Sequence, residues 1–264
     1  MENQFGRTSI CRLRAEKREG KTQLAQISFT APFKIMSPFY DQSEWMRVML
    51  LSASAGIMEG DVQEFDIQVG KDARMSFSAQ AYEKIHKMRE GRARRKASLT
   101  VEEGGALDYH SQPVIPFAQS AFSSTLEARL VDESALFCYE EILSCGRTAY
   151  GEAFDYRLYQ NLVEVRRADK LIYRDNCFFT PKTMDMEGIG MYEGYHHCGT
   201  FLLFGKRVGQ EQIEKIRKQF EEDTECEGGI TRISDLDLAV RVLGNRAQHL
   251  EELFAHIRAL CIGY

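Results

Sequence analysis

The sequence lacks closely spaced cysteine pairs and long apolar segments. Its seven cysteines are odd in number and show no C-x-x-C spacing, which excludes the usual ligand pattern of a structural zinc site and indicates free thiols, several of them in the core. No segment approaches the roughly 20 apolar residues needed to cross a bilayer. Basic residues interrupt the first twenty positions, where a secretory signal would carry an apolar stretch. We therefore expect a cytoplasmic protein without a membrane partner.

An excess of positive charge is also missing. The formal net charge of −5 argues against a general nucleic-acid binder. The motifs G-x-S-x-G, H-E-x-x-H and G-x-x-x-x-G-K-[ST], which mark several classes of hydrolase and nucleotide-binding enzyme, do not occur. With 44% hydrophobic and 28% charged residues, the chain has the composition of a globular protein that buries a real core. Its chemistry favours a binding or scaffold protein over an enzyme.

A glycine corner between two apolar segments is the most informative stretch that is present. An apolar run leads into small residues, and Gly56 and Gly60 then frame a short turn that ends on Asp61. In the next segment, Val62–Val69, apolar and polar residues alternate as they do on a half-buried strand. The stretch predicts a strand, a corner and a second strand, with the Asp61 carboxylate accepting hydrogen bonds from nearby amides.

Strand patterns dominate the chain, and helical periodicity appears only late. Because many short strands follow one another, we expect a mainly β protein without β-α-β units, folded as one domain over residues 1–264. Apolar residues at helical spacing predict two helices, at residues 209–223 and 247–261. Strands are expected at residues 62–69, 122–130, 136–143, 154–158, 162–166, 171–173 and 236–243.

Two segments between the strand patterns are unusual in composition. Residues 84–96 concentrate lysine and arginine. We expect a solvated hairpin loop there, and the alternative is a basic patch that meets an acidic partner. Pro113 and Pro116 are expected to hold residues 113–117 extended and outside the hydrogen-bonded ladders.

One polar cluster, His196, His197 and Cys198, has the side chains to hold a nickel or zinc ion. Adjacent residues on a strand point to opposite faces, so at most two of the three would bind the same ion. We therefore expect a turn with ordinary polar side chains. A cytosolic metal-dependent hydrolase that uses His196 and His197 stays as an alternative function, as does a β-rich adaptor without a metal role.

Four short motifs carry a family resemblance. They are S-A-G-x-x-x-G-D at residues 54–61, S-x-Q-A-Y-E-K-I-H at 78–86, P-V-I-P-F at 113–117 and E-I-L-x-x-G-R at 141–147. In this order and spacing the chain resembles the urease accessory proteins of the UreD family, called UreH in some systems. The resemblance runs from about Phe29 to the C-terminus, and the tail up to about residue 28 lends it no support.

The resemblance implies a mainly β fold, a helical stack of β-sheets with two α-helices in the C-terminal part. It implies a urease maturation chaperone rather than an enzyme. Such a protein binds the urease apoprotein and UreF, reaches the GTPase UreG through UreF, and supports nickel delivery to urease as a scaffold and metal conduit. Nickel would then be a transient cargo, and we expect no tightly bound cofactor.

The matched motifs also supply candidate site residues. A conduit needs weak ligands spaced apart, because a closed thiolate site would trap the ion, so we expect no tight metal site. We predict that Arg147 fixes a buried carboxylate by paired hydrogen bonds. The candidates for metal transit or an interface are Asp61, Glu83 and Glu141, with His86 and His110 as lesser candidates. The residues with a structural role in the motifs are Gly56, Gly60, Pro113, Pro116, Gly146 and Arg147.

Overall fold

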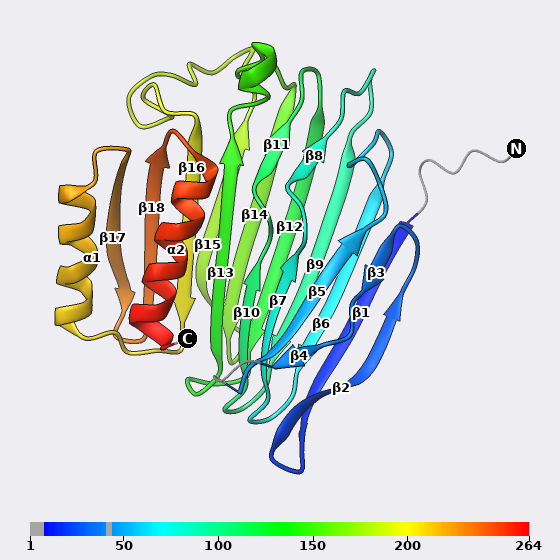
Figure 1. Cartoon of the computed structure of the whole chain (residues 1–264), viewed down its shortest axis with the longest axis vertical. Helices are drawn as coiled ribbons and strands as arrows, with labels where there is room; N and C mark the ends of the chain where they lie inside the picture. Colours follow the sequence, from blue (N-terminus) through cyan, green and yellow to red (C-terminus); the bar gives the residue numbers. More distant parts are fainter. Residues whose placement is uncertain (1–7, 41–43, 264) are drawn as a thin grey trace, which may run out of the picture.

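Two mixed β-sheets face each other across a shared apolar core, and two helices cover the outer side of one sheet (Figure 1). The computed structural model describes residues 8–40 and 44–263. The first sheet has seven strands, in the order β15 (Lys170–Phe179), β14 (Leu158–Arg167), β12 (Ala121–Leu130), β9 (Ala93–Val101), β6 (Val62–Val69), β1 (Thr8–Arg18) and β2 (Lys21–Phe29).

The second sheet carries the remaining strands. Its main path has the order β17 (Cys226–Ser234), β18 (Asp237–Gly244), β16 (His197–Phe204), β13 (Leu136–Ser144), β10 (Ala106–His110), β7 (Arg74–Ala79), β5 (Met46–Ser52) and β3 (Phe33–Ile35). Three short strands pair beside this path, namely β4 (Phe39–Tyr40), β8 (Glu83–Ile85) and β11 (Val114–Pro116). A 3-10 turn, η1 (Thr148–Tyr150), follows β13.

The chain winds as a coil between the two sheets. From β5 to β14 its long strands alternate between the second and the first sheet, so that parallel neighbours in one sheet are joined through a strand of the other. Parallel strands always need a crossover connection, and here a strand takes the place of the usual helix. This confirms the prediction of a mainly β fold, a helical stack of sheets without β-α-β units.

Alternation along the strands builds the core. One buried cluster contains Ile67 and Val101 of the first sheet together with Phe77 and Phe137 of the second. On β6 and β9, the residues that alternate with these core residues point outward.

The two late helices are confirmed as α1 (Gln210–Glu222) and α2 (Ala247–Ile262). They pack on the outer side of β13, β16, β17 and β18. In the described ranges, neither helix combines the length and apolar character needed to cross a membrane.

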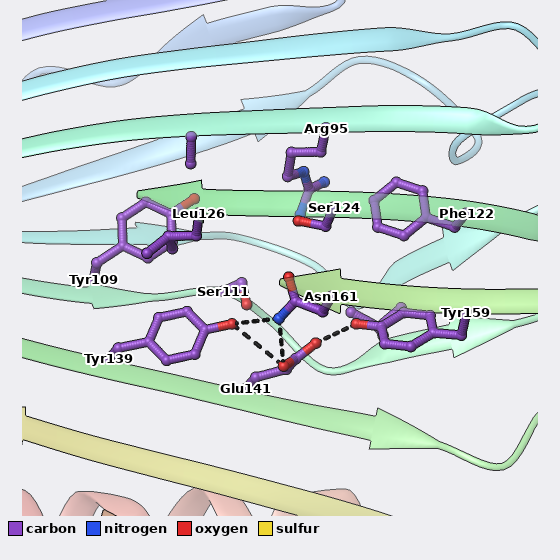
Figure 2. Close-up of a pocket in the computed structure, with 12 residues that line it drawn as sticks. Arg95, Tyr109, Ser111, Phe122, Ser124, Leu126, Tyr139, Glu141, Tyr159 and Asn161 are labelled. Atoms are coloured by element: carbon purple, nitrogen blue, oxygen red, sulfur yellow. Dashed lines mark hydrogen bonds between the residues drawn. The ribbon is translucent and has the colours of Figure 1, made fainter. Parts of the chain in front are cut away.

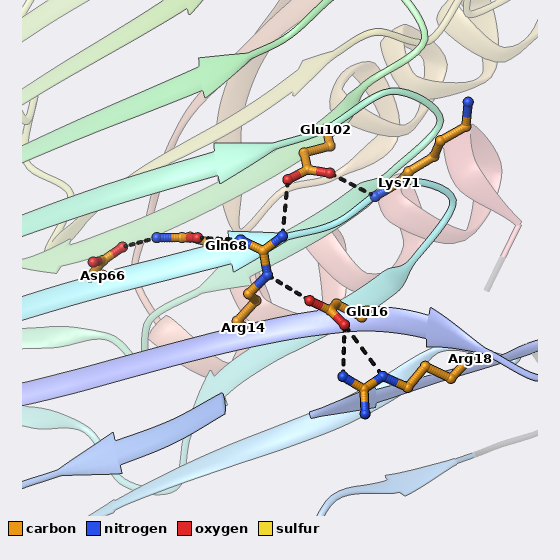
Figure 3. Close-up of polar contacts among 7 residues, drawn as sticks. All are labelled: Arg14, Glu16, Arg18, Asp66, Gln68, Lys71 and Glu102. Carbon is orange, nitrogen blue, oxygen red and sulfur yellow. Dashed lines mark hydrogen bonds and ion pairs between the residues drawn. The ribbon is translucent and has the colours of Figure 1, made fainter. Parts of the chain in front are cut away.

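The outer side of the first sheet is polar. Figure 3 shows Arg14 of β1 at the centre of its contacts, donating to Glu16 over 2.8 Å and to Gln68 of β6 over 3.0 Å. Arg14 and Glu102 also form an ion pair at 3.4 Å. The paired side chains are 32–40% exposed, so this face is a solvated sheet surface on which such pairs contribute little to stability.

The N-terminal segments form a hairpin, in which β1 and β2 pair antiparallel around a turn at Glu19 and Gly20. Residues 1–7 of the N-terminal tail lie outside the described residues. The strand predicted at residues 154–158 is wrong except for its last residue, because β14 begins at Leu158. Strands β16 and β17 have no counterpart in the prediction.

The two segments of unusual composition also differ from expectation. Residues 84–96 are not a hairpin loop, because β7 and β9 lie in different sheets and β9 already begins at Ala93. Residues 114–116 are not outside the ladders, because β11 pairs parallel with β8, and Val114 also pairs with Leu143 of β13. Proline removes only its own donor, so its neighbours remain free to pair.

Candidate functional site: a polar row inside the sheet stack

The four motifs of the sequence lie together at one end of the sheet stack. Ile57 of the glycine corner donates its N–H to Lys84 O over 2.8 Å. The strand that contains Lys84, β8, then pairs with β11, and β11 pairs with β13. Segments as far apart in the sequence as those that contain Ile57 and Leu143 thus lie together at the upper end of the stack in Figure 1.

Two motif glycines are required by close backbone approach. A Cβ on Gly56, whose φ is +150°, would lie 2.4 Å from Lys84 O. A Cβ on Gly146, whose φ is +148°, would lie 2.6 Å from Glu152 O. Neither position accepts a side chain without a shift of the opposite backbone. Gly60 lies in the same corner with a φ of +82°.

Arg147 contacts two other segments at this end of the stack, through Glu152 and Phe117. Its guanidinium donates through Nε to Glu152 over 2.8 Å and through Nη2 to the other carboxylate oxygen, which confirms the predicted paired hydrogen bonds. The guanidinium also lies over the ring of Phe117, 4.0 Å from its centroid. The predicted partner is a buried carboxylate, but the Glu152 side chain is 18% exposed and therefore only partly buried.

A row of polar residues crosses the inner side of the first sheet. Ladder register places each of them opposite the next, so all six lie at one level of the strands. Residues opposite each other in register point to the same face. Most residues two positions away on these strands, which share that face, are apolar core residues. From β1 to β15 the row consists of Ser9, Gln63, Arg95, Ser124, Asn161 and Cys177.

Glu141 on β13 faces this row from the second sheet. Figure 2 shows its carboxylate between three donors. Asn161 Nδ2 donates to Glu141 Oε2 over 2.7 Å, Tyr139 Oη donates to the same oxygen over 3.3 Å, and Tyr159 Oη donates to Oε1. Burial raises the pKa of Glu141 above its ordinary range, although the hydrogen bonds from Tyr159 and Asn161 oppose the shift.

Arg95 is the second buried charge at this level. Its two terminal nitrogens donate to the Glu83 carboxylate over 2.7 and 2.5 Å, and its Nε donates to Gln63 over 3.0 Å. Burial works to lower the pKa of Arg95, but the Glu83 carboxylate outweighs it and the pKa is raised. Arg95 therefore stays charged, and Glu83 neutralises it inside the stack.

A small cavity of about 20 Å³ lies between Glu141 and Arg95. A cavity needs about 10–15 Å³ to hold one water molecule, so this one admits a single water or a bare ion. The twelve described residues that line it offer carboxylate, phenol, amide and hydroxyl oxygens and include neither cysteine nor histidine. Oxygen ligands of this kind hold a borderline divalent ion weakly.

The polar level continues on the second sheet toward the molecular surface. In register, Glu141 lies opposite Thr200, and Thr200 lies opposite Arg241 of β18. Arg241 Nη1 donates to Thr200 Oγ1 over 2.7 Å, and its Nη2 pairs with Asp175 of β15. The Arg241 side chain is 42% exposed. The polar groups therefore extend from the buried Glu141 to the partly exposed pair of Arg241 on β18 and Asp175 on β15.

The other predicted site residues lie away from the cavity, each in its own local contacts. The Asp61 carboxylate accepts the Met58 N–H over 2.7 Å, as predicted for the corner, and does not line the cavity. His86 Nε2 lies 3.0 Å from Ala55 O. His110 Nδ1 lies 3.2 Å from Asp108 Oδ2, and although burial works to lower its pKa, Asp108 outweighs burial and raises it. Of the candidates, Glu141 lines the cavity and Glu83 reaches it through Arg95.

The turn expected for the histidine cluster is wrong for two of its three residues, because His197 and Cys198 begin β16, whereas His196 lies in the bend before it. His197 and Cys198 point to opposite faces of that strand, so they do not share an ion.

The sequence prediction missed Arg95, Tyr139, Tyr159 and Asn161. A signal for them was present, because Tyr159 and Asn161 occupy the same strand face as Val163 and Val165. A polar residue on the apolar face of a strand marks a buried polar contact.

The comparisons with known proteins agree with the motifs. A sequence model of the family described as "UreD urease accessory protein" matches residues 7–263. A urease accessory protein UreD of Acetivibrio thermocellus is 39% identical over 259 residues, which cover 98% of this chain and 98% of that protein. A urease accessory protein UreH of Helicobacter pylori strain G27 is 31% identical over 259 residues, covering 97% and 96%.

Proposed function

The chain belongs to the UreD family of urease accessory proteins, and from this premise we propose that it is a nickel-delivery chaperone for urease. It binds the urease apoprotein and UreF in the cytoplasm, reaches UreG through UreF, and passes Ni²⁺ along the polar row inside its sheet stack. It has no catalytic activity of its own, and nickel is its cargo.

The polar row is the observation that carries this proposal. A line of six polar side chains through an apolar core costs free energy of folding, because each buried polar group must find a hydrogen-bond partner. A transport role gives a reason for this cost. Here the row lies beside one buried carboxylate, Glu141, whose ligand oxygens face a cavity large enough for one ion. A cation that approaches Glu141 would favour the charged form of its carboxyl group, since a nearby positive charge lowers a carboxyl pKa.

Weak binding suits transit. Amide, phenol and carboxylate oxygens bind Ni²⁺ less tightly than thiolate or imidazole groups do, so an ion at Glu141 is released onward. Glu83 compensates Arg95 at the same level, which reduces the repulsion that a free guanidinium would exert on a passing cation.

Partner binding is supported by an uncovered part of the inner sheet surface. Ile27 and Phe29 on edge strand β2 pair with the buried residues Leu13 and Cys11, so they point to the inner side of the first sheet. They are nevertheless 48% and 41% exposed, because the second sheet ends at β3. Phe39 and Tyr40 of β4 are exposed as well, and Tyr40 Oη donates to Thr22 O of β2 over 2.5 Å. Exposed apolar side chains gathered on one face mark protein-binding surfaces.

The role in urease maturation is tested in cells that carry the urease structural genes and all other accessory genes. We expect urease activity and urease-bound nickel to collapse when this gene is removed, while urease subunit levels and nickel uptake stay equal. Normal maturation without this chain, and without a paralogue, would overturn the proposal. Turnover by the purified protein with a stoichiometric metal would favour the hydrolase alternative.

The nickel route is tested by Glu141→Gln, which keeps the side-chain size and removes the charge. We expect urease nickel content to fall by at least about tenfold, as for other changes at metal-binding positions. The matched control is Glu164→Gln on the outer side of β14, where Glu164 pairs with Arg166 and Arg174 at the surface. Equal nickel contents for both variants, at equal soluble chaperone levels, would exclude this route and favour an adaptor without a metal role.

The partner proposal has a separate readout. Because the apolar side chains on β2 and β4 are exposed in the isolated chain, co-expression with UreF is expected to raise its soluble yield. Equal soluble yields with and without UreF would contradict this expectation.

A further inference from the structure

A mixed cluster of metal-binding side chains lies outside the polar row, where the two helices meet the edge of the second sheet. Asp223 is the residue at which α1 ends, Cys226 begins β17, and His249 lies in the first turn of α2. Their ligand atoms all lie within 4.8 Å of one another. Within residues 8–40 and 44–263 this is the only such group of three.

We propose that Asp223, Cys226 and His249 form a binding site for one borderline divalent metal ion of the zinc and nickel class. A thiolate, an imidazole and a carboxylate are the donors that such ions accept, and three protein ligands leave a fourth position for water or an incoming group. The thiolate and the carboxylate together carry two negative charges, which balance the ion. The negative end of the α1 dipole adds a favourable field at Asp223.

The atoms are close to the positions that a bound ion requires. Zinc–nitrogen and zinc–oxygen bonds of about 2.0–2.2 Å in a tetrahedral site place the imidazole and carboxylate ligand atoms about 3.3–3.5 Å apart. His249 Nε2 and Asp223 Oδ2 are now hydrogen-bonded at 2.7 Å, so the ion needs them to separate by less than about 1 Å. Asp223 Oδ1 accepts the Glu225 N–H over 2.8 Å. One carboxylate oxygen is therefore held by the backbone, while the other, Oδ2, already faces His249 and would exchange that hydrogen bond for a bond to the ion.

The site is sheltered yet reachable. Cys226 is 4% exposed, and the side chains of Asp223 and His249 are 13% and 25% exposed. Burial raises the pKa of the Cys226 thiol to about 12, with a further contribution from Asp223 and Glu225. A metal must therefore displace the thiol proton on binding, which keeps the affinity below that of an open thiolate site.

A further carboxylate lies behind the imidazole. Glu225 Oε2 is 3.9 Å from His249 Nδ1, on the side of the ring away from Asp223, and Arg246 holds Glu225 through its guanidinium. Metal-bound histidines usually orient their second nitrogen toward a carboxylate. A bound ion would also join the end of α1 to the start of α2, and so stabilise the helical layer.

The test uses the full-length purified protein and does not depend on the proposed role in urease maturation. Co²⁺ and Zn²⁺ are titrated separately by calorimetry, and Co²⁺ also by absorption. We expect one ion per chain, a thiolate-to-cobalt charge-transfer band, and an unfolding temperature that rises with metal. Cys226→Ser and His249→Ala are expected to lose the band and to weaken binding by at least about tenfold, and Glu225→Gln by about tenfold.

Matched controls are His256→Ala, an exposed histidine on the same helix, and Cys261→Ser, another buried thiol of α2. Both are expected to bind as the parent protein does. Unchanged binding in His249→Ala, or a charge-transfer band that survives Cys226→Ser, would overturn the proposal, as would equal losses in the controls. If Cys226→Ser does not fold by circular dichroism, His249→Ala decides the question, because its side chain is partly exposed.

Discussion

Asn161 of the first sheet reaches across the interior and donates a hydrogen bond of 2.7 Å to Glu141 of the second. The same amide donates to the Tyr139 hydroxyl over 3.0 Å. One side chain therefore supplies two of the polar contacts that join the sheets at the level of the cavity. The position of the Glu141 carboxylate depends on this amide.

Replacing Asn161 by alanine is expected to lower the free energy of unfolding by about 1–3 kcal/mol, because Glu141 and Tyr139 each lose a buried partner. Urea denaturation measures the change. The control is Gln160→Ala, one residue away on the outer side of β14, where the amide makes an exposed contact of 3.4 Å with Asn176. The control is expected to change stability by at most about 0.5 kcal/mol. Equal effects at both positions would contradict the buried contact.

Glu141 predicts a pH dependence of stability. Burial raises its folded-state pKa above the ordinary value of 4.5, so the folded protein binds this proton more strongly than the unfolded chain does. The resulting stabilisation is complete below about pH 4.5 and is lost as pH rises through the folded-state pKa. Glu141→Gln has no such proton to lose. Its stability relative to the parent protein is therefore expected to increase as pH rises through this window.

The measurement is urea denaturation of both proteins at several pH values from 4.5 upward. Taking the difference between the two proteins cancels the titration of the groups that they share. A difference that stays constant with pH would contradict the raised pKa of Glu141.

Arg95 and its neighbour Arg94 distinguish a buried from an exposed charge in the basic segment. Arg95→Met removes both hydrogen bonds to Glu83 and leaves that carboxylate without its partner at a position only 18% exposed. The expected cost is about 3 kcal/mol. Arg94→Met changes an outward-facing side chain of the same strand and is expected to cost at most about 0.5 kcal/mol. Thermal unfolding compares the two, and similar midpoints would place Arg95 at the surface.

The contrast between these two arginines also explains how far the sequence predicts the fold. Alternation in Val62–Val69 and the apolar stripe Ile213, Ile216 and Phe220 predict one strand and one helix correctly, because each pattern is local. The prediction of a loop at the basic segment is wrong because a high charge density is typical of loops, whereas the burial of each side chain depends on which side of the strand it occupies. Arg95 points inward and Arg94 outward.

The candidate site is harder to predict because it depends on register between strands distant in sequence. Glu141 is predicted through its motif, whereas Asn161 and Arg95 belong to no motif. The row forms only when β9, β12 and β14 lie side by side at one register. That order results from the coil of the chain between two sheets, and no local pattern of residues encodes it.

Gly56 links the sequence motif to the geometry of the corner, and its replacement gives the last prediction. A Cβ at this position meets the Lys84 carbonyl at 2.4 Å and the His86 ring at 2.7 Å, and the φ of +150° is unfavourable for alanine. Gly56→Ala is expected to lower the free energy of unfolding by about 1–3 kcal/mol. Gly229→Ala on β17 is the control, since its Cβ meets nothing within 4 Å. Urea denaturation measures both changes. If Gly56→Ala is destabilised no more than the control, the backbone of the corner accommodates a Cβ without loss of stability, and close backbone approach does not explain the glycine.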